Sequence, residues 1–479
     1  MMDAVSIPLG ASLKPYPEYK DSGLPWLGRV PGHWGMRRAK VLLRERVDKG
    51  FPNEPLLAAT QSKGVVRKED YGTRTVTAQK DFHLLKLVEV GDFVISLRSF
   101  EGGIEVAHSR GIISPAYTVL EPRSKAASGY LRHFFKSPTF ISSLTLFVTG
   151  IREGQNIDYE RLSRAFLPLP PPEEQAAIVR YLDHALLRLD RAMRAKRKTI
   201  ALLNEQKQAI IHRAVTRGLA PDVPLKDSGI PWLGQIPAHW ETPLLGRCVI
   251  HIEQGWSPVA AEGEFDADQW AVLTLSSVRR GVFNPTAIKP VSKSADIPKG
   301  IEVANGDVLL TRSNTRDRVG DVCIVDGVRP KTILCDLIYR LTIQERLLHP
   351  KFLVNQLLSP LGRGLIERDA RGSSGTMPKI SQSHIKSWRI LLPPMEEQKK
   401  IIQSINSETI HLVSTIERIE REIELLREYR TRLIADVVTG KLDVREAAAR
   451  LPKVESAPTD ETKLAELEES GEELAEENI

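Results

Sequence analysis

Arginine, asparagine, glutamine, serine and lysine side chains gather in four polar loops, and these residue types suit contacts to nucleic acids. Arginine can form two hydrogen bonds to guanine, asparagine and glutamine can do the same to adenine, and serine and lysine suit phosphate oxygens. Each half of the chain has one such loop after a Gly-Asp pair and an apolar strand (GDFVISLRSFEGG, GDVLLTRSNTRDRVG) and a second, glycine-rich one (GIREGQNIDYERL, ARGSSGTMPKISQSHI). Any single residue could equally be a solvated loop residue, but the clustering in both halves favours a nucleic-acid interface. The candidate DNA-binding residues are Arg98, Ser99, Arg152, Gln155 and Asn156 in the first half, and Arg312, Ser313, Asn314, Arg316, Arg371, Ser373, Ser374 and Lys379 in the second.

Motifs for catalysis and cofactor binding are missing from the sequence. It has no G-x-x-x-x-G-K-[ST] phosphate loop, no G-x-G-x-x-G after a strand, no G-x-S-x-G nucleophile turn and no Cys/His metal cluster. The glycine motif and the Asn-Pro-Pro-aromatic motif of an adenine methyltransferase are also missing. We therefore expect no catalytic residue, no metal site and no cofactor in this chain.

The composition is that of a globular protein with a basic body. Of 479 residues, 41% are hydrophobic and 27% charged, enough for two to four domains. The net charge of +6 divides into about −8 for residues 453–479 and about +14 for the rest, which favours a polyanionic partner. The acidic tail is either solvated and disordered or a weak nucleic-acid mimic. Without an apolar membrane span, a signal-peptide layout or paired cysteines, we expect a cytoplasmic protein with no membrane partner.

Two sequence blocks occur twice. KDSGLPWLGRVPGHW (residues 20–34, the first anchor) and KDSGIPWLGQIPAHW (residues 226–240, the second anchor) share 11 of 15 residues at an offset of 206. PPPEEQ (170–175) and PPMEEQ (393–398) repeat at an offset of 223, so the second copy is 17 residues longer between the blocks. The chain is therefore two copies of one module. We interpret each anchor as a rigid packed loop, with His33 and His239 as structural histidines rather than metal ligands.

A long helix is predicted after each PP-x-EEQ block. Residues 173–216 and 396–439 contain no proline or glycine, and their apolar residues step by three and four, which is typical of a coiled coil. We favour antiparallel pairing of the two helices, and the alternative is that each helix packs on its own globular domain. The predicted helix-pair core is Leu182, Leu189, Ile200, Leu203, Ile210, Ile405, Leu412, Ile419, Ile423, Leu426 and Leu433.

The segments between the anchors and the helices predict two mixed α/β domains, called head 1 and head 2 below. Short β-rich runs such as 92–97 and 307–311 alternate with glycine, proline, asparagine and aspartate, and short helices are expected at 128–136 and 350–358. The predicted domains are 1–34 (N-terminal segment with the first anchor), 35–168 (head 1), 169–219 (first long helix), 220–240 (linker with the second anchor), 241–391 (head 2), 392–445 (second long helix) and 446–479 (acidic tail).

This array of motifs resembles the specificity subunit of type I restriction-modification systems. The resemblance covers residues 15–445 and rests on both anchors, both LPPxEEQ blocks, the helices and the final LIADVVTGKLDV (433–444). The first helix departs mildly from this pattern, since it ends in AVTRGL. The resemblance implies an α+β fold in which two target-recognition domains are separated by a long antiparallel two-helix coiled coil, with a pseudo-two-fold internal repeat.

The resemblance also implies a function without catalysis in this chain. Each target-recognition domain would bind one half of a bipartite, asymmetric double-stranded DNA site, and the helices would set the spacer. Two methyltransferase subunits and two motor-nuclease subunits would be the partners, carrying S-adenosylmethionine, Mg and ATP. One alternative is a noncatalytic coiled-coil scaffold whose heads bind protein; the other, a self-contained nuclease, is disfavoured by the missing motifs.

Overall fold

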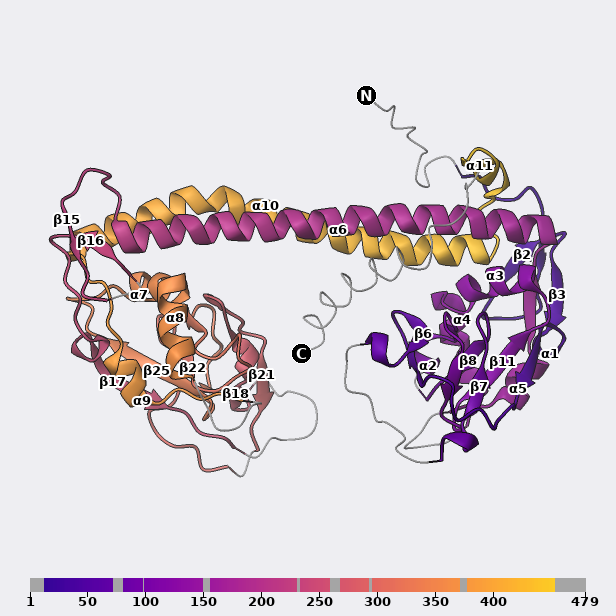
Figure 1. Cartoon of the computed structure of the whole chain (residues 1–479), viewed down its shortest axis with the longest axis horizontal. Coiled ribbons are helices and arrows are strands. Elements are labelled where there is room, and N and C mark those ends of the chain that lie inside the picture. Colours follow the sequence, from indigo (N-terminus) through magenta and orange to yellow (C-terminus); the bar gives the residue numbers. More distant parts are fainter. Residues whose placement is uncertain are drawn as a thin grey trace. The chain divides into compact units, whose positions relative to one another are not determined.

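The chain folds into two compact units, each of which contains one head and part of both long helices. The computed structural model describes residues 13–71, 81–97, 99–149, 156–230, 233–258, 268–292, 295–370 and 377–452. Unit 1 comprises Met1–Lys196 with Arg421–Ile479, and unit 2 comprises Arg197–Glu420. Figure 1 labels many of their helices and strands, and these elements confirm the predicted mixture of helices and strands.

Head 1 is built on a four-stranded antiparallel sheet in the order β4-β11-β8-β9. These strands are β4 (Leu43–Arg46), β11 (Thr118–Pro122), β8 (Phe93–Ile95) and β9 (Glu105–Val106). Helices α3 (Lys125–Phe134) and α4 (Pro138–Ser143) pack on it through Phe134, Phe135 and Phe140, which are at most 1% exposed. The other strands are β1 (Tyr19–Asp21), β2 (Arg29–Pro31), β3 (Gly35–Arg38), β5 (Leu57–Thr60), β6 (Gly64–Arg67), β7 (Lys86–Val88), β10 (Gly111–Ile113), β12 (Val148–Thr149), β13 (Asn156–Ile157) and β14 (Phe166–Leu169), and the other helices are α1 (Ala39–Leu42), α2 (Ser99–Gly102) and α5 (Tyr159–Arg164).

Head 2 repeats this sheet in the order β17-β25-β22-β23. Its strands are β17 (Val249–Gln254), β25 (Ile338–Ile343), β22 (Val308–Thr311) and β23 (Val322–Ile324), covered by α7 (Pro350–Leu358) and α8 (Pro360–Asp369). A second sheet, β21-β18-β24, contains a parallel pair between β18 and β24. The remaining elements are β15 (Leu225–Asp227), β16 (Gln235–Pro237), β18 (Ala271–Leu273), β19 (Val278–Arg279), β20 (Val282–Phe283), β21 (Ile288–Pro290), β24 (Thr332–Ile333), α9 (Gln382–Ser387) and α11 (Arg445–Ala449, in unit 1).

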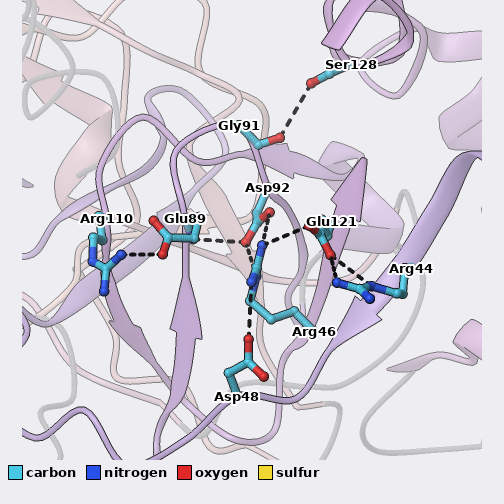
Figure 2. Close-up of polar contacts among 9 residues, drawn as sticks. All are labelled: Arg44, Arg46, Asp48, Glu89, Gly91, Asp92, Arg110, Glu121 and Ser128. Carbon is cyan, nitrogen blue, oxygen red and sulfur yellow. Dashed lines mark hydrogen bonds and ion pairs between the residues drawn. The ribbon is translucent and has the colours of Figure 1, made fainter. Parts of the chain in front are cut away.

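The Gly-Asp pairs directly before β8 and β22 form turns with the same hydrogen bonds, and that of head 1 is the more deeply buried. In head 1 the Asp92 carboxylate accepts the Glu89 backbone N–H (2.9 Å) and the Arg46 guanidinium (2.8 Å), as Figure 2 shows. In head 2 Asp307 accepts the Ala304 N–H (2.9 Å) and Arg340 (3.1 Å). Burial raises the pKa of Asp92 and the arginine opposes it, so the ion pair offsets the cost of a buried charge. The two heads thus share a framework that their sequences barely reveal.

The two predicted long helices are present as α6 (Pro172–Arg217) and α10 (Met395–Val438). Within unit 1 the pairs Lys196–Glu422 (2.5 Å) and Asp190–Arg430 (3.8 Å) join them in antiparallel order. Within unit 2 Arg213 of α6 lies 3.6 Å from Glu408 of α10. The alternative of packing on the heads also holds in part, because Ile178, Leu182 and Ala185 share the core of head 1.

The predicted helix-pair core divides by burial. Among the residues with low exposure are Leu182, Leu189, Ile405, Ile419, Ile423 and Leu433. Half-buried are Ile200, Leu203, Ile210, Leu412 and Leu426. None of these five belongs to the hydrophobic clusters of the described residues that also contain head residues. Leu189, Ile419 and Ile423 also lie outside these clusters but are buried, so outside the clusters only part of the seam is open to solvent.

Two findings on the described residues bear on the remaining expectations. None of their helices is long and apolar enough to cross a membrane, and no group of three or more His, Cys, Asp or Glu side chains among them could hold a metal ion. The three cysteines, Cys248, Cys323 and Cys335, are free and buried.

Candidate nucleic-acid interface and the anchors that support it

The first anchor is fastened to the start of helix α6 by one carboxylate. Glu174 accepts the indole N–H of Trp34 (2.8 Å), lies 2.7 Å from the ring nitrogen of His33 and accepts the hydroxyl of Tyr16. Trp34 is fully buried, and the Glu174 side chain is 4% exposed. Burial, and next the hydrogen bond to Glu174, raise the pKa of Tyr16, so this hydroxyl remains a donor. A buried carboxylate with three donors is a strong local constraint.

The second anchor repeats this arrangement at the start of α10. Glu397 accepts the indole N–H of Trp240 (3.1 Å) and lies 2.7 Å from His239. Position 16 corresponds to Asp222 at the offset of 206, so the second copy has no tyrosine there. Consistent with this, the Glu397 side chain is 27% exposed.

These contacts confirm the anchors as packed loops and both histidines as structural residues. Lys20 donates to the Trp34 carbonyl, and Lys226 donates to the Trp240 carbonyl, so the repeated lysine also has the same partner in both copies. Trp26 packs beside Phe134, whereas Trp232 lies outside the described residues. The EEQ blocks do more than begin the helices that the sequence predicts, because Glu174 and Glu397 each bind an anchor. The sequence signal for this contact was the joint repetition of His-Trp and Glu-Glu-Gln.

The anchors also join the end of one helix to the start of the other. In unit 1 the buried Val437 and Val438 at the end of α10 share a core with Trp34, and Tyr130 of α3 donates to the Val438 carbonyl (2.8 Å). In unit 2 Ala214 and Val215 near the end of α6 share a core with Trp240. Each head is therefore held at a junction of three segments: an anchor, a helix start and a helix end.

The candidate loops of head 1 lie partly outside the described residues. Arg98, Arg152 and Gln155 fall there, and of Asn156 only the backbone, in strand β13, is described. Strand β13 contacts the short helix α2 that Ser99 begins, so the two predicted loops of head 1 come together. Ser99 itself is 1% exposed, and its hydroxyl accepts the Ser96 N–H (2.8 Å).

In head 2 the structure also brings the two predicted loops together. Ser313 and Lys379 form a β-bridge, and the N–H of Ile380 donates to the Arg312 carbonyl (2.9 Å). Arg316 and Lys379 are exposed, whereas Arg312 is half-buried with its guanidinium 5.9 Å from the centre of the Tyr339 ring. The Asn314 side chain accepts the N–H of Thr315 (2.9 Å). Outside the described residues lie Arg371, Ser373 and Ser374.

Two of the candidate residues need correction. The Ser99 and Ser313 side chains are both buried, each 1% exposed. A hydroxyl shielded from solvent cannot reach a phosphate unless the loop opens. Both hydroxyls are therefore shielded from a ligand, and that of Ser99 accepts a hydrogen bond within its own loop. The pattern of polar residue types could not reveal this, because burial depends on the helices packed behind the loops.

Comparison with known proteins places the chain among recognisable relatives. Residues 295–425 match the family model of the type I restriction modification DNA specificity domain. The chain is 26% identical over 204 residues to the specificity subunit of the type I restriction enzyme EcoEI of Escherichia coli (42% of this chain, 34% of that one). It is 25% identical over 309 residues to that of EcoKI of E. coli (64% and 62%) and 24% identical over 456 residues to a putative one, MjaX, of Methanocaldococcus jannaschii (88% and 96%).

The extent of these matches differs between relatives. The chain spans about a third of the EcoEI subunit and under two thirds of the EcoKI subunit, but nearly all of the MjaX subunit. A chain from a solved structure of a type I restriction-modification system shares its fold, with a TM-score of 0.57 at 16% identity over 86% of this chain and 99% of that one. The resemblance inferred from the repeated motifs is thereby confirmed: this chain is a relative of the specificity subunits of type I restriction-modification systems.

Proposed function

We propose that this chain is the noncatalytic DNA-recognition subunit of a type I restriction-modification complex. Each head would be a target-recognition domain that binds one half of a bipartite, asymmetric DNA site. The observation that carries the proposal is the repeated framework under different loops. Both heads have the same sheet order, Gly-Asp turn and Trp–Glu anchor, yet their exposed loop sequences differ. One scaffold with two sets of polar loops suits two different half-sites.

The long helices would set the spacer between the half-sites. Each is a single uninterrupted helix, of 46 residues in α6 and 44 in α10. At about 1.5 Å per residue, such helices extend for about 65–70 Å. A stiff antiparallel coiled coil of this length would separate the heads by a fixed distance. The predicted division into segments 1–34, 35–168, 169–219, 220–240, 241–391, 392–445 and 446–479 belongs to this proposal.

The internal repeat would offer two equivalent binding surfaces to other subunits. Because each anchor joins a helix start and a helix end in the same way, two copies of one methyltransferase subunit could bind alike. Two motor-nuclease subunits would complete the restriction complex. S-adenosylmethionine would belong to the methyltransferase and ATP with Mg to the motor, and adenine N6 would be the methylated atom. We place the complex in the cytoplasm.

Co-expression with the neighbouring methyltransferase gene, followed by methylation-aware sequencing of the host DNA, tests this proposal. We expect N6-methyladenine in a bipartite motif. Arg316→Ala should relax only the half-site bound by head 2, since this exposed arginine lies in a candidate loop. Arg247→Ala, at an exposed arginine that pairs with Glu241 (3.2 Å), is the matched control and should change neither half. Unchanged methylation despite a formed complex would reject the proposal.

The protein-binding scaffold is distinguished by its response to salt. DNA binding through Arg and Lys releases counterions, so the affinity of a DNA-recognition complex should fall steeply with salt concentration. Binding that is insensitive to both salt and sequence would favour the scaffold instead.

A further inference from the structure

One lysine in head 1 holds the loop between β8 and β9 from behind. The ammonium of Lys136, which lies between α3 and α4, donates to the backbone carbonyls of Gly102 (2.8 Å) and Gln61 (3.0 Å). It also forms an ion pair with Glu105 at the start of β9 (2.6 Å). One cation thus ties α2, the β5–β6 turn and the first residue of the next strand to the helical layer.

An arginine in head 2 makes the corresponding set of contacts. Arg363 of α8 donates to the backbone carbonyls of Val319 (2.9 Å) and Asp317 (3.2 Å), both in the loop between β22 and β23. Its guanidinium lies 3.9 Å from the carboxylate of Asp321, directly before β23. Although the two cations occupy different positions of the helical layer, each reaches the same loop of the repeated sheet.

A glycine lets each loop approach the helical layer closely. Gly103 has φ +85°, and a Cβ there would lie 2.2 Å from the Phe135 carbonyl oxygen. Gly320 has φ +75°, and a Cβ there would lie 2.7 Å from the Ile366 side chain. Since a larger residue at either position would push the loop away or displace its neighbour, both loops lie pressed against the helical layer that contains the cations.

Energetics favour a role in loop position over a role in stability. Glu105 and Asp321 are 4% and 2% exposed, and burial raises the pKa of both carboxyl groups against the opposing effect of the cation. A buried ion pair of this kind adds little stability compared with apolar residues of similar size, but it fixes geometry. Because each cation also donates hydrogen bonds to loop carbonyls, the ion pair can hold the loop in one position.

We propose that Lys136 and Arg363 are positioning residues for DNA-base recognition. Lys136 sets the position of the loop between β8 and β9, and Arg363 that of the loop between β22 and β23. Each thereby determines how strongly its head discriminates between matching and non-matching half-sites. This inference rests on the proposed function. It concerns residues that would not touch DNA, since they contact the loops from the side of the helical layer.

Paired substitutions separate loop position from fold stability. The double substitution Lys136→Met/Glu105→Leu removes both charges of the ion pair in head 1. The double substitution Arg363→Met/Asp321→Asn does the same in head 2, where the new amide oxygen can still accept the Arg280 N–H (3.3 Å). Each full-length variant is assembled with the methyltransferase. The dissociation constant is then measured on duplexes carrying the intact motif or a motif with one half scrambled.

We expect each double variant to lose about tenfold in discrimination at one half-site, within the range of a single base-specific contact. The two variants should affect opposite halves, with thermal unfolding close to wild type. Lys136→Arg, which keeps the cation, should retain discrimination. Arg110→Met removes two other ion pairs of head 1, with Glu54 (2.9 Å) and with Glu89, and should also leave discrimination unchanged.

The contrary outcomes are distinct. If wild type discriminates and the double variants discriminate equally well, the positioning role is refuted while the proposed function stands. If discrimination at both halves falls together with thermal stability, the pairs only support the fold. A wild-type complex without half-site discrimination would overturn the proposed function and this inference with it.

Hydrogen exchange of the free chain provides a readout without DNA. In Lys136→Met/Glu105→Leu we expect faster exchange in residues 99–105 and unchanged exchange in β11, which lies in the same sheet. Equal acceleration throughout head 1 would contradict a local positioning role.

Discussion

The two anchors differ by one hydrogen bond, and this difference predicts unequal effects of the same substitution. Glu174 has three donors, Trp34, His33 and Tyr16, whereas Glu397 has Trp240 and His239. A hydrogen bond to a charged group contributes about 1.5–3 kcal/mol. Removing the carboxylate should therefore destabilise the first anchor by about 2 kcal/mol more than the second, or about thirtyfold in the opening equilibrium.

Hydrogen exchange measured by mass spectrometry can test this difference locally. The backbone N–H groups of Trp34 and Trp240 are matched probes, because each donates to a proline carbonyl at 3.0 Å, that of Pro31 or Pro237. Glu174→Ala should accelerate exchange of the peptide containing Trp34 by some factor relative to wild type. That factor should be about thirty times larger than the acceleration of the peptide containing Trp240 in Glu397→Ala.

Tyr16→Phe provides the control for the extra bond. Combined with Glu174→Ala, it should add little further acceleration, because the hydroxyl has already lost its acceptor. In a chain that already carries Tyr16→Phe, Glu174→Ala should accelerate exchange at the first anchor by about the same factor as Glu397→Ala does at the second. Equal acceleration at both anchors, or acceleration of the Trp240 peptide in Glu174→Ala, would refute the reasoning.

Three further predictions follow from buried charges and exposed loops. Burial raises the pKa of Glu105 from 4.5 to about 7, so between these pH values folded head 1 keeps a proton that the unfolded chain has lost. This group should therefore lower the stability of head 1 by about 3 kcal/mol as pH rises from about 4.5 to about 7. A urea midpoint that falls as much in Glu105→Gln as in wild type over this range would contradict this. Arg46→Met leaves the Asp92 carboxylate, 3% exposed, without its cation, and should lower the free energy of unfolding of head 1 by about 3 kcal/mol, read from the same titration; an unchanged midpoint would show that the pair is dispensable. Ser313→Ala should leave half-site discrimination by the assembled complex intact, whereas Arg316→Ala should reduce it about tenfold; the reverse order would mean that the loop of head 2 opens on DNA.

Local signals in the sequence predict the elements but not how the strands pair. The long helices were predicted at 173–216 and 396–439 and observed as Pro172–Arg217 and Met395–Val438, because their apolar steps and flanking prolines and glycines are local features. The identical sheet order of the two heads could not be predicted, since strand pairing joins residues far apart in the chain.

The supporting contacts of the candidate interface were hidden for the same reason. Lys136 and Glu105 are separated by 31 residues, and nothing in either neighbourhood marks them as partners. Residue type alone suggested Ser99 as a phosphate contact, but its burial depends on tertiary packing. The Glu174 anchor could have been found, because both of its partner motifs repeat.

A measurement of the DNA spacer tests the central claim most directly. Four residues are inserted in α6 near Leu203, with a matching insertion in α10 near Ile416 that keeps the antiparallel pairing seen at Arg213 and Glu408. The insertion adds about 6 Å, the length of about two base pairs. Methylation-aware sequencing should then show a longer spacer between two unchanged half-sites. Altered half-sites, or an unchanged spacer in an active complex, would contradict the separation of binding heads from a measuring helix pair.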